Sequence, residues 1–211
     1  MKFNTLLLIS LISILLAFIP YNHQKAKKKI DKIKPDSLLV VGMDFQNKEL
    51  MRSIGNNITS YYHLPVAYQE IKMPKTAFSP YGRNRYDGNI IISELKKMNK
   101  DRYHFIVGLT DQDICTQKKG IKDYGIFGLG SLDNSGCISS TKRLKKNVSA
   151  AKLQERLTKV VLHEIGHNMG LNHCNSPQPC FMKDAGGKLS TVDKEPMELC
   201  ARCKKQLLKN K

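Results

Sequence analysis

The twelve residues HEIGHNMGLNHC, 163–174, constrain the fold more than any other stretch of the chain. Side chains four residues apart lie on one face of a helix, so a helix here places the imidazoles of His163 and His167 side by side. Glycine ends helices readily because it adopts left-handed backbone conformations. Gly170 therefore predicts a turn after the helix, and that turn can bring His173 back to the first two histidines.

Three histidines and one glutamate in this arrangement predict a zinc hydrolase. Zinc binds imidazole nitrogen, and catalytic zinc sites use three protein ligands and keep a fourth position open. Glu164 lies about 100° round the helix from His163, so it can reach a water instead of the ion. A bare H-E-x-x-H also occurs by chance on amphipathic helices. Here the glycine and third histidine complete the extended metzincin pattern, which makes chance a poor explanation.

Four cysteines follow the third histidine, with a methionine between them. They are Cys174, Cys180, Cys200 and Cys203, and the methionine is Met182. The whole stretch resembles the archaemetzincins (archaelysins), whose pattern is H-E-x-x-H-x-x-G-x-x-H-C-x4-C-x-M-x17-C-x-x-C. One feature departs from that pattern, because the five residues NSPQP separate Cys174 from Cys180 where the family has four. We expect this insertion in a proline-containing loop to be tolerated.

The resemblance implies a compact metzincin-like domain with zinc-dependent peptidase activity. It implies His163, His167 and His173 as ligands of a catalytic zinc, Glu164 as the catalytic base and Met182 as the methionine of the Met-turn. It also implies a second, structural zinc on the four cysteines, hence two zinc ions per chain. From the residues alone, four thiolates with a C-x-x-C pair suit a closed tetrahedral zinc site, and two disulfides are the alternative.

Two further cysteines, Cys115 and Cys137, lie outside this pattern. They are expected to be buried thiols, or a disulfide if the domain is exported.

Upstream of residue 149, apolar and β-branched runs alternate with segments of helical periodicity. Strands are expected at 36–43, 64–73, 103–114, 124–132 and 136–144, and helices at 46–62, 89–100 and 149–170. This order predicts an α/β (α+β) fold, a mixed twisted sheet with helices packed on it, over a peptidase domain of residues 36–211.

The N-terminal part has a different composition. Residues 6–19, LLLISLISILLAFI, are apolar except for two serines, a length that suits a signal-peptide core better than a full membrane span. We expect residues 1–20 to be a signal peptide or membrane anchor and residues 21–35 to be a lysine-rich linker. Positive charge favours the cytoplasmic side, so the domain is expected to be cytoplasmic and membrane-associated. An exported domain is the alternative.

The formal net charge of +17 favours anionic partners. Lysine and arginine gather in three basic clusters, at residues 25–34, 142–146 and 202–211. These clusters lack interleaved aromatic residues, so no specific nucleic-acid binding is expected. The leading hypothesis is a monomeric zinc metallopeptidase acting on peptides or proteins, with endopeptidase and aminopeptidase activity both open. One alternative is a non-catalytic zinc-stabilised binding module, which would not need Glu164. Another is an adaptor for membrane surfaces or nucleic acid, driven by the basic clusters.

Overall fold

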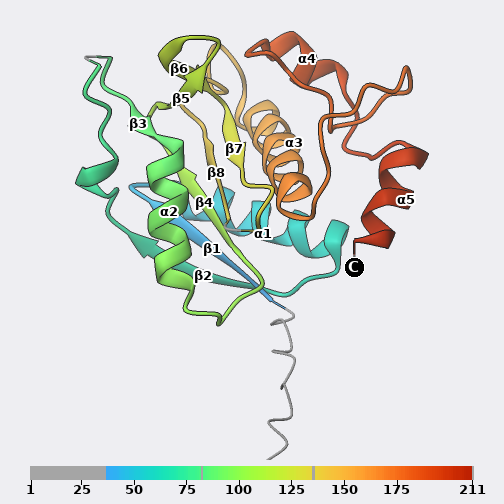
Figure 1. Ribbon diagram of the computed structural model, residues 1–211, viewed down its shortest axis with the longest axis horizontal. Coiled ribbons are helices and arrows are strands. Elements are labelled where there is room, and N and C mark those ends of the chain that lie inside the picture. The colour runs from blue at the N-terminus through green and yellow to red at the C-terminus, as the bar shows by residue number, and fades with distance from the viewer. Residues whose placement is uncertain (1–36, 82, 135, 211) are drawn as a thin grey trace, which may run out of the picture. The chain divides into compact units, whose positions relative to one another are not determined.

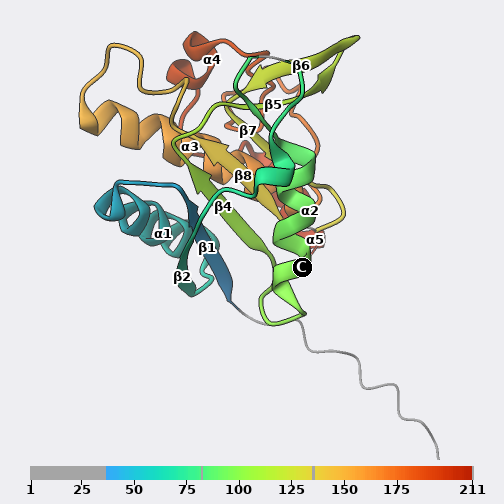
Figure 2. The same ribbon diagram turned by 90° about the vertical axis from the view of Figure 1, so that its left-hand side faces the viewer.

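A five-stranded sheet forms the centre of the computed structural model, which describes residues 37–81, 83–134 and 136–210 (Figures 1 and 2). Its strand order is β2-β1-β4-β8-β7. The first four strands run parallel and β7 is an antiparallel edge strand. The strands are β1 (Leu38–Met43), β2 (Val66–Ile71), β4 (Ile106–Thr110), β7 (Gly128–Gly130) and β8 (Cys137–Ser140).

Helices cover both faces of this sheet, which explains why every residue of the central strands β1, β4 and β8 is buried. Alternate residues of β1 enter different cores, so Leu38 and Val40 pack in the core that includes α1 (Lys48–Tyr62) and α3 (Ala150–Asn168). Their neighbours Leu39 and Val41 pack in the core that includes α2 (Gly88–Asn99).

A smaller sheet lies beside the first and contains β3 (Tyr86–Asp87), β5 (Ile114–Lys118) and β6 (Ile121–Ile126) in the order β3-β5-β6. A short 3₁₀ helix, η1 (Lys75–Ala77), precedes it. Asp113, at the start of the β5–β6 hairpin, forms ion pairs with Arg85 at 2.8 Å and with Arg143 at 2.7 Å. These partly buried pairs attach the hairpin to the rest of the domain.

The predicted fold class is confirmed, and the predicted helices are found with ends shifted by at most two residues. The single strands predicted at 103–114 and 124–132 were wrong. The first divides into β4 and β5 and the second spans β6 and β7, and in each case the two strands belong to different sheets. The chain turns after Thr110 because Asp111 accepts hydrogen bonds from the Gln46 N–H and the Thr141 hydroxyl.

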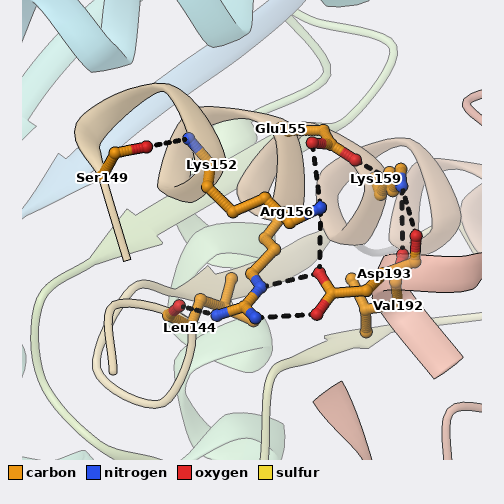
Figure 3. Close-up of polar contacts among 8 residues, drawn as sticks. All are labelled: Leu144, Ser149, Lys152, Glu155, Arg156, Lys159, Val192 and Asp193. Carbon is orange, nitrogen blue, oxygen red and sulfur yellow. Dashed lines mark hydrogen bonds and ion pairs between the residues drawn. The ribbon is translucent and has the colours of Figure 1, made fainter. Parts of the chain in front are cut away.

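The C-terminal segment forms two short helices, α4 (Leu189–Lys194) and α5 (Ala201–Lys209). Figure 3 shows how α3 holds α4. The guanidinium of Arg156 donates to both carboxylate oxygens of Asp193, at 2.8 and 2.7 Å, and to the Leu144 carbonyl at 2.9 Å. The ammonium of Lys159 donates to Glu155 at 2.7 Å and to the Val192 carbonyl at 3.2 Å.

The predicted anchor (residues 1–20) and linker (residues 21–35) lie outside the described residues and stay predictions. Within the residues that the structure does describe, no helix is long and apolar enough to cross a membrane.

The Arg156–Asp193 contact predicts a pH-dependent contribution to stability. The Arg156 guanidinium lowers the pKa of Asp193 from 3.8 to about 2. The group therefore stabilises the fold above its unfolded pKa, and this stabilisation is lost as pH falls from about 4 through 2. We expect Asp193→Asn to lower the free energy of unfolding at pH 7 by about 1 to 2 kcal/mol, after discounting for the part-exposed carboxylate.

Urea denaturation of both proteins between pH 7 and pH 3 measures this difference, which should shrink below pH 4. Metal loss in acid affects both proteins alike, so the difference between them remains informative. Glu70→Gln is the control, because Glu70 pairs with Lys48 at the surface and should contribute less than about 1 kcal/mol. A difference that stays constant down to pH 3 would contradict the assignment.

Candidate active site

Helix α3 and the turn after it bring three histidines together. Gly170 has a φ of +79°, and the Leu171 N–H donates to the Gly166 carbonyl at 2.9 Å, so the helix ends in the left-handed turn that glycine permits. One ring nitrogen from each of His163, His167 and His173 lies within 4.8 Å of the others.

The ring orientations of two of these histidines suit a metal ion. The Nδ1 of His163 is 2.6 Å from the Phe181 carbonyl, and the Nδ1 of His167 is 2.7 Å from the Leu171 carbonyl. Because a carbonyl only accepts, both Nδ1 atoms carry the proton and both Nε2 atoms present lone pairs. The two Nε2 atoms are 3.0 Å apart, close to the roughly 3.3 Å expected between two imidazole nitrogens on a tetrahedral zinc.

Protonation of His163 and His167 is unfavourable at neutral pH. Burial and, to a lesser extent, the neighbouring His167 together lower the pKa of His163 to about 3. Burial also lowers the pKa of His167. Both rings are therefore neutral near pH 7, and facing lone pairs repel unless a cation lies between them. The residues present thus fit a zinc ion.

Glu164 is buried between α3 and the edge strand β7. The backbone of Gly130 hydrogen-bonds its carboxylate, but burial dominates and raises its pKa to about 8. A cation on the adjacent imidazoles would lower this pKa again. Glycine is required on β7 because a Cβ at Gly128 would lie 2.6 Å from Glu164 Oε1, and one at Gly130 would lie 2.5 Å from the Glu164 carbonyl oxygen.

Met182 is fully buried beneath the motif helix. A Cβ at Gly166 would lie 2.5 Å from its sulfur, so the glycine of the motif makes room for this side chain. The Met182 carbonyl accepts from the Cys174 N–H at 2.8 Å, and the preceding residue supplies the carbonyl that orients His163. The segment around Met182 therefore packs against the helix of the motif and fixes the orientation of the His163 ring.

The four downstream cysteines form a second cluster, in which the Sγ atoms of Cys174, Cys180, Cys200 and Cys203 all lie within 4.8 Å of one another. All four are buried and free, and the Sγ atoms of Cys174 and Cys200 are 3.7 Å apart. A disulfide has a length of about 2.05 Å, whereas two thiolates on a tetrahedral zinc lie about 3.8 Å apart. The cluster fits zinc, and the extra residue between Cys174 and Cys180 does not prevent the four sulfurs from meeting.

The remaining two cysteines, Cys115 and Cys137, are free buried thiols. Burial raises the pKa of both, so they carry no charge at pH 7.

A cavity of about 370 Å³ opens over the histidines and Glu164. It is lined by the β5–β6 hairpin, β7, α3 and several residues of the segment 181–195. The sequence indicated neither this lining nor the contacts of Gly128, Gly130 and Asp184. These residues come close to the motif only through tertiary packing.

A helix that presents histidines and a buried carboxylate to a cavity of this kind is the arrangement of a zinc-dependent hydrolase. Residues 42–209 match peptidase family M54. An archaemetzincin of Saccharolobus solfataricus is 30% identical over 174 residues, which cover 79% of this chain and 90% of the relative. One of Nanoarchaeum equitans is 31% identical over 142 residues, covering 67% of this chain and 73% of the relative.

Solved archaemetzincin structures share the fold. That from Methanopyrus kandleri has a TM-score of 0.72 at 24% identity and covers 86% of this chain and 98% of its own. That from Archaeoglobus fulgidus, complexed with malonate, has a TM-score of 0.67 at 22% identity and covers 81% and 99%. The protein is thus a zinc metallopeptidase. It belongs to peptidase family M54, the archaemetzincins.

The close approach of β7 to Glu164 predicts that Gly128→Ala impairs peptide hydrolysis. The added methyl group must displace the Glu164 carboxylate, and misplacement by about 1 Å can cost about 10²-fold in rate. We expect kcat to fall between about 10- and 100-fold, with zinc content and circular dichroism unchanged. A kcat equal to that of the wild type would show that this approach does not constrain the carboxylate.

Proposed function

We propose that this metallopeptidase cleaves peptide bonds with zinc held by His163, His167 and His173 and with Glu164 as general base. The strongest support is the pair of Nε2 atoms 3.0 Å apart, whose rings direct their Nδ1 protons to backbone carbonyls. Two neutral imidazoles in this orientation offer lone pairs to a cation and to little else. The buried carboxylate beside them supplies the second part of the mechanism.

Zinc, when bound, would polarise the scissile carbonyl and lower the pKa of the attacking water, so that the water loses a proton readily at neutral pH. Glu164 accepts a proton from the attacking water and passes it to the leaving amine. The backbone of Gly130 holds the carboxylate in place. The carbonyls of Phe181 and Leu171 keep the rings of His163 and His167 in the ligating tautomer, as partners of ligating histidines generally do.

The buried position of Glu164 favours an enzyme over a zinc-stabilised binding module. Burying a carboxyl group costs free energy, and a module without chemistry gains nothing from it. The carboxyl lies against the cavity and one residue from the first histidine, which is the position that a base requires.

We also propose that the cysteine cluster holds a second, structural zinc. Four thiolates make a closed tetrahedral site, and structural zinc contributes directly to folding. Cys174 and Cys180 follow the histidine motif and Cys200 and Cys203 lie at the start of α5, so one ion would connect the end of the histidine motif to α5.

The base is tested by Glu164→Gln. The amide is nearly isosteric but cannot accept the proton, so we expect hydrolysis of a peptide library to fall about 10²–10⁴-fold. Zinc content should be unchanged. His173→Ala is the comparison variant, which should lower both the rate and the affinity for the catalytic zinc. Wild-type rates in Glu164→Gln would refute the mechanism, and a wild type that cleaves nothing would support the binding module.

The zinc count is tested by elemental analysis of protein purified under reducing conditions. We expect about two zinc ions per chain. The double variant Cys200→Ser/Cys203→Ser should lose one ion and destabilise the C-terminal segment. His163→Ala should lose the other ion and stay folded. One zinc per wild-type chain, with the four cysteines in disulfides, would exclude the thiolate site.

A further inference from the structure

The third histidine differs from the first two in what holds its ring. Backbone carbonyls accept from the Nδ1 atoms of His163 and His167. The side chain of His173 is 47% exposed, and its Nδ1 faces the carboxylate of Asp184, with Oδ2 at 4.0 Å. It follows the helix in a turn, so it needs an external partner more than the two histidines on α3 do.

Asp184 is itself held in a defined position. Its Oδ1 accepts from the Gly186 N–H at 2.8 Å, and its Oδ2 lies 3.4 Å from the ammonium of Lys118 on β5. The hydroxyl of Tyr124 on β6 donates to the Gly186 carbonyl at 3.2 Å. Two contacts therefore connect the segment 184–187 to the β5–β6 hairpin, and the carboxylate stays directed at the histidine.

We propose that Asp184 is the positioning residue of the third zinc ligand. When zinc is bound, the carboxylate of Asp184 accepts a hydrogen bond from the Nδ1 proton of His173, which leaves Nε2 free for the ion. The carboxylate fixes the tautomer and increases the basicity of the ring, as it does in other carboxylate–histidine–zinc arrangements. A movement of about 1 Å converts the observed separation into a hydrogen bond. The inference rests on the proposed zinc site.

This arrangement links the substrate cavity to the metal. Lys118 and Tyr124 line the cavity and also hold the segment that carries Asp184. A displacement of the hairpin would move the carboxylate away from His173 and weaken one of three ligands. The other two ligands depend on backbone carbonyls and would be unaffected.

The test measures zinc affinity of the full chain by competition with a chromophoric chelator, together with the visible spectrum of the cobalt-substituted protein. Asp184→Asn keeps the shape of the side chain and removes its charge. We expect the affinity of the histidine site to fall about 10- to 100-fold. The cobalt spectrum of that site should change, and the cysteine site should keep its metal.

Lys118→Met is the matched variant, because it removes the other partner of Asp184. It keeps the carboxylate and its hydrogen bond from the Gly186 N–H, so the proposal expects a smaller loss of zinc affinity, of about threefold or less. If Asp184→Asn stays within about twofold of the wild type, or if Lys118→Met loses as much affinity as Asp184→Asn, Asp184 only pairs with Lys118 and the proposal is wrong. If the proposed zinc site itself is wrong, His163→Ala will bind as much zinc as the wild type. This result distinguishes failure of the zinc site from failure of the role of Asp184.

Discussion

The facing imidazoles of His163 and His167 are the interaction on which the rest of the site depends. Two neutral rings with lone pairs 3.0 Å apart repel, so other groups must fix their orientation. The carbonyls of Phe181 and Leu171 do this by accepting the Nδ1 protons. The turn at Gly170 brings the Leu171 carbonyl to His167, and the segment around Met182 brings the Phe181 carbonyl to His163.

The second constraint is the distance between α3 and the edge strand β7. Glycine at 128 and 130 lets the strand touch the helix, buries Glu164 and raises its pKa to about 8. The same burial that makes the carboxyl basic also makes it expensive to keep charged without a nearby cation. A cation on the adjacent imidazoles would therefore lower this pKa and stabilise the charged carboxylate.

The cysteine cluster and the histidine cluster share a short piece of chain. Cys174 follows His173 directly, and its N–H donates to the Met182 carbonyl. A change in the cysteine cluster would thus reach both the third histidine and the methionine beneath the first two. The C-terminal segment is also held by the contact between Arg156 and Asp193, and residues of this segment line one side of the cavity.

The sequence by itself determined the parts of this protein that depend on local spacing. Histidines four residues apart share a helix face, and a glycine three residues after His167 ends the helix, whatever surrounds them. It also identified the family and the helices α1, α2 and α3, but not the short helices α4 and α5. Only the tertiary structure decided the partners of each ring, the glycines opposite Glu164, the place of Asp184 and the division of 103–114 between two sheets. These depend on contacts between residues far apart in the chain, and no periodicity within a segment reports such contacts.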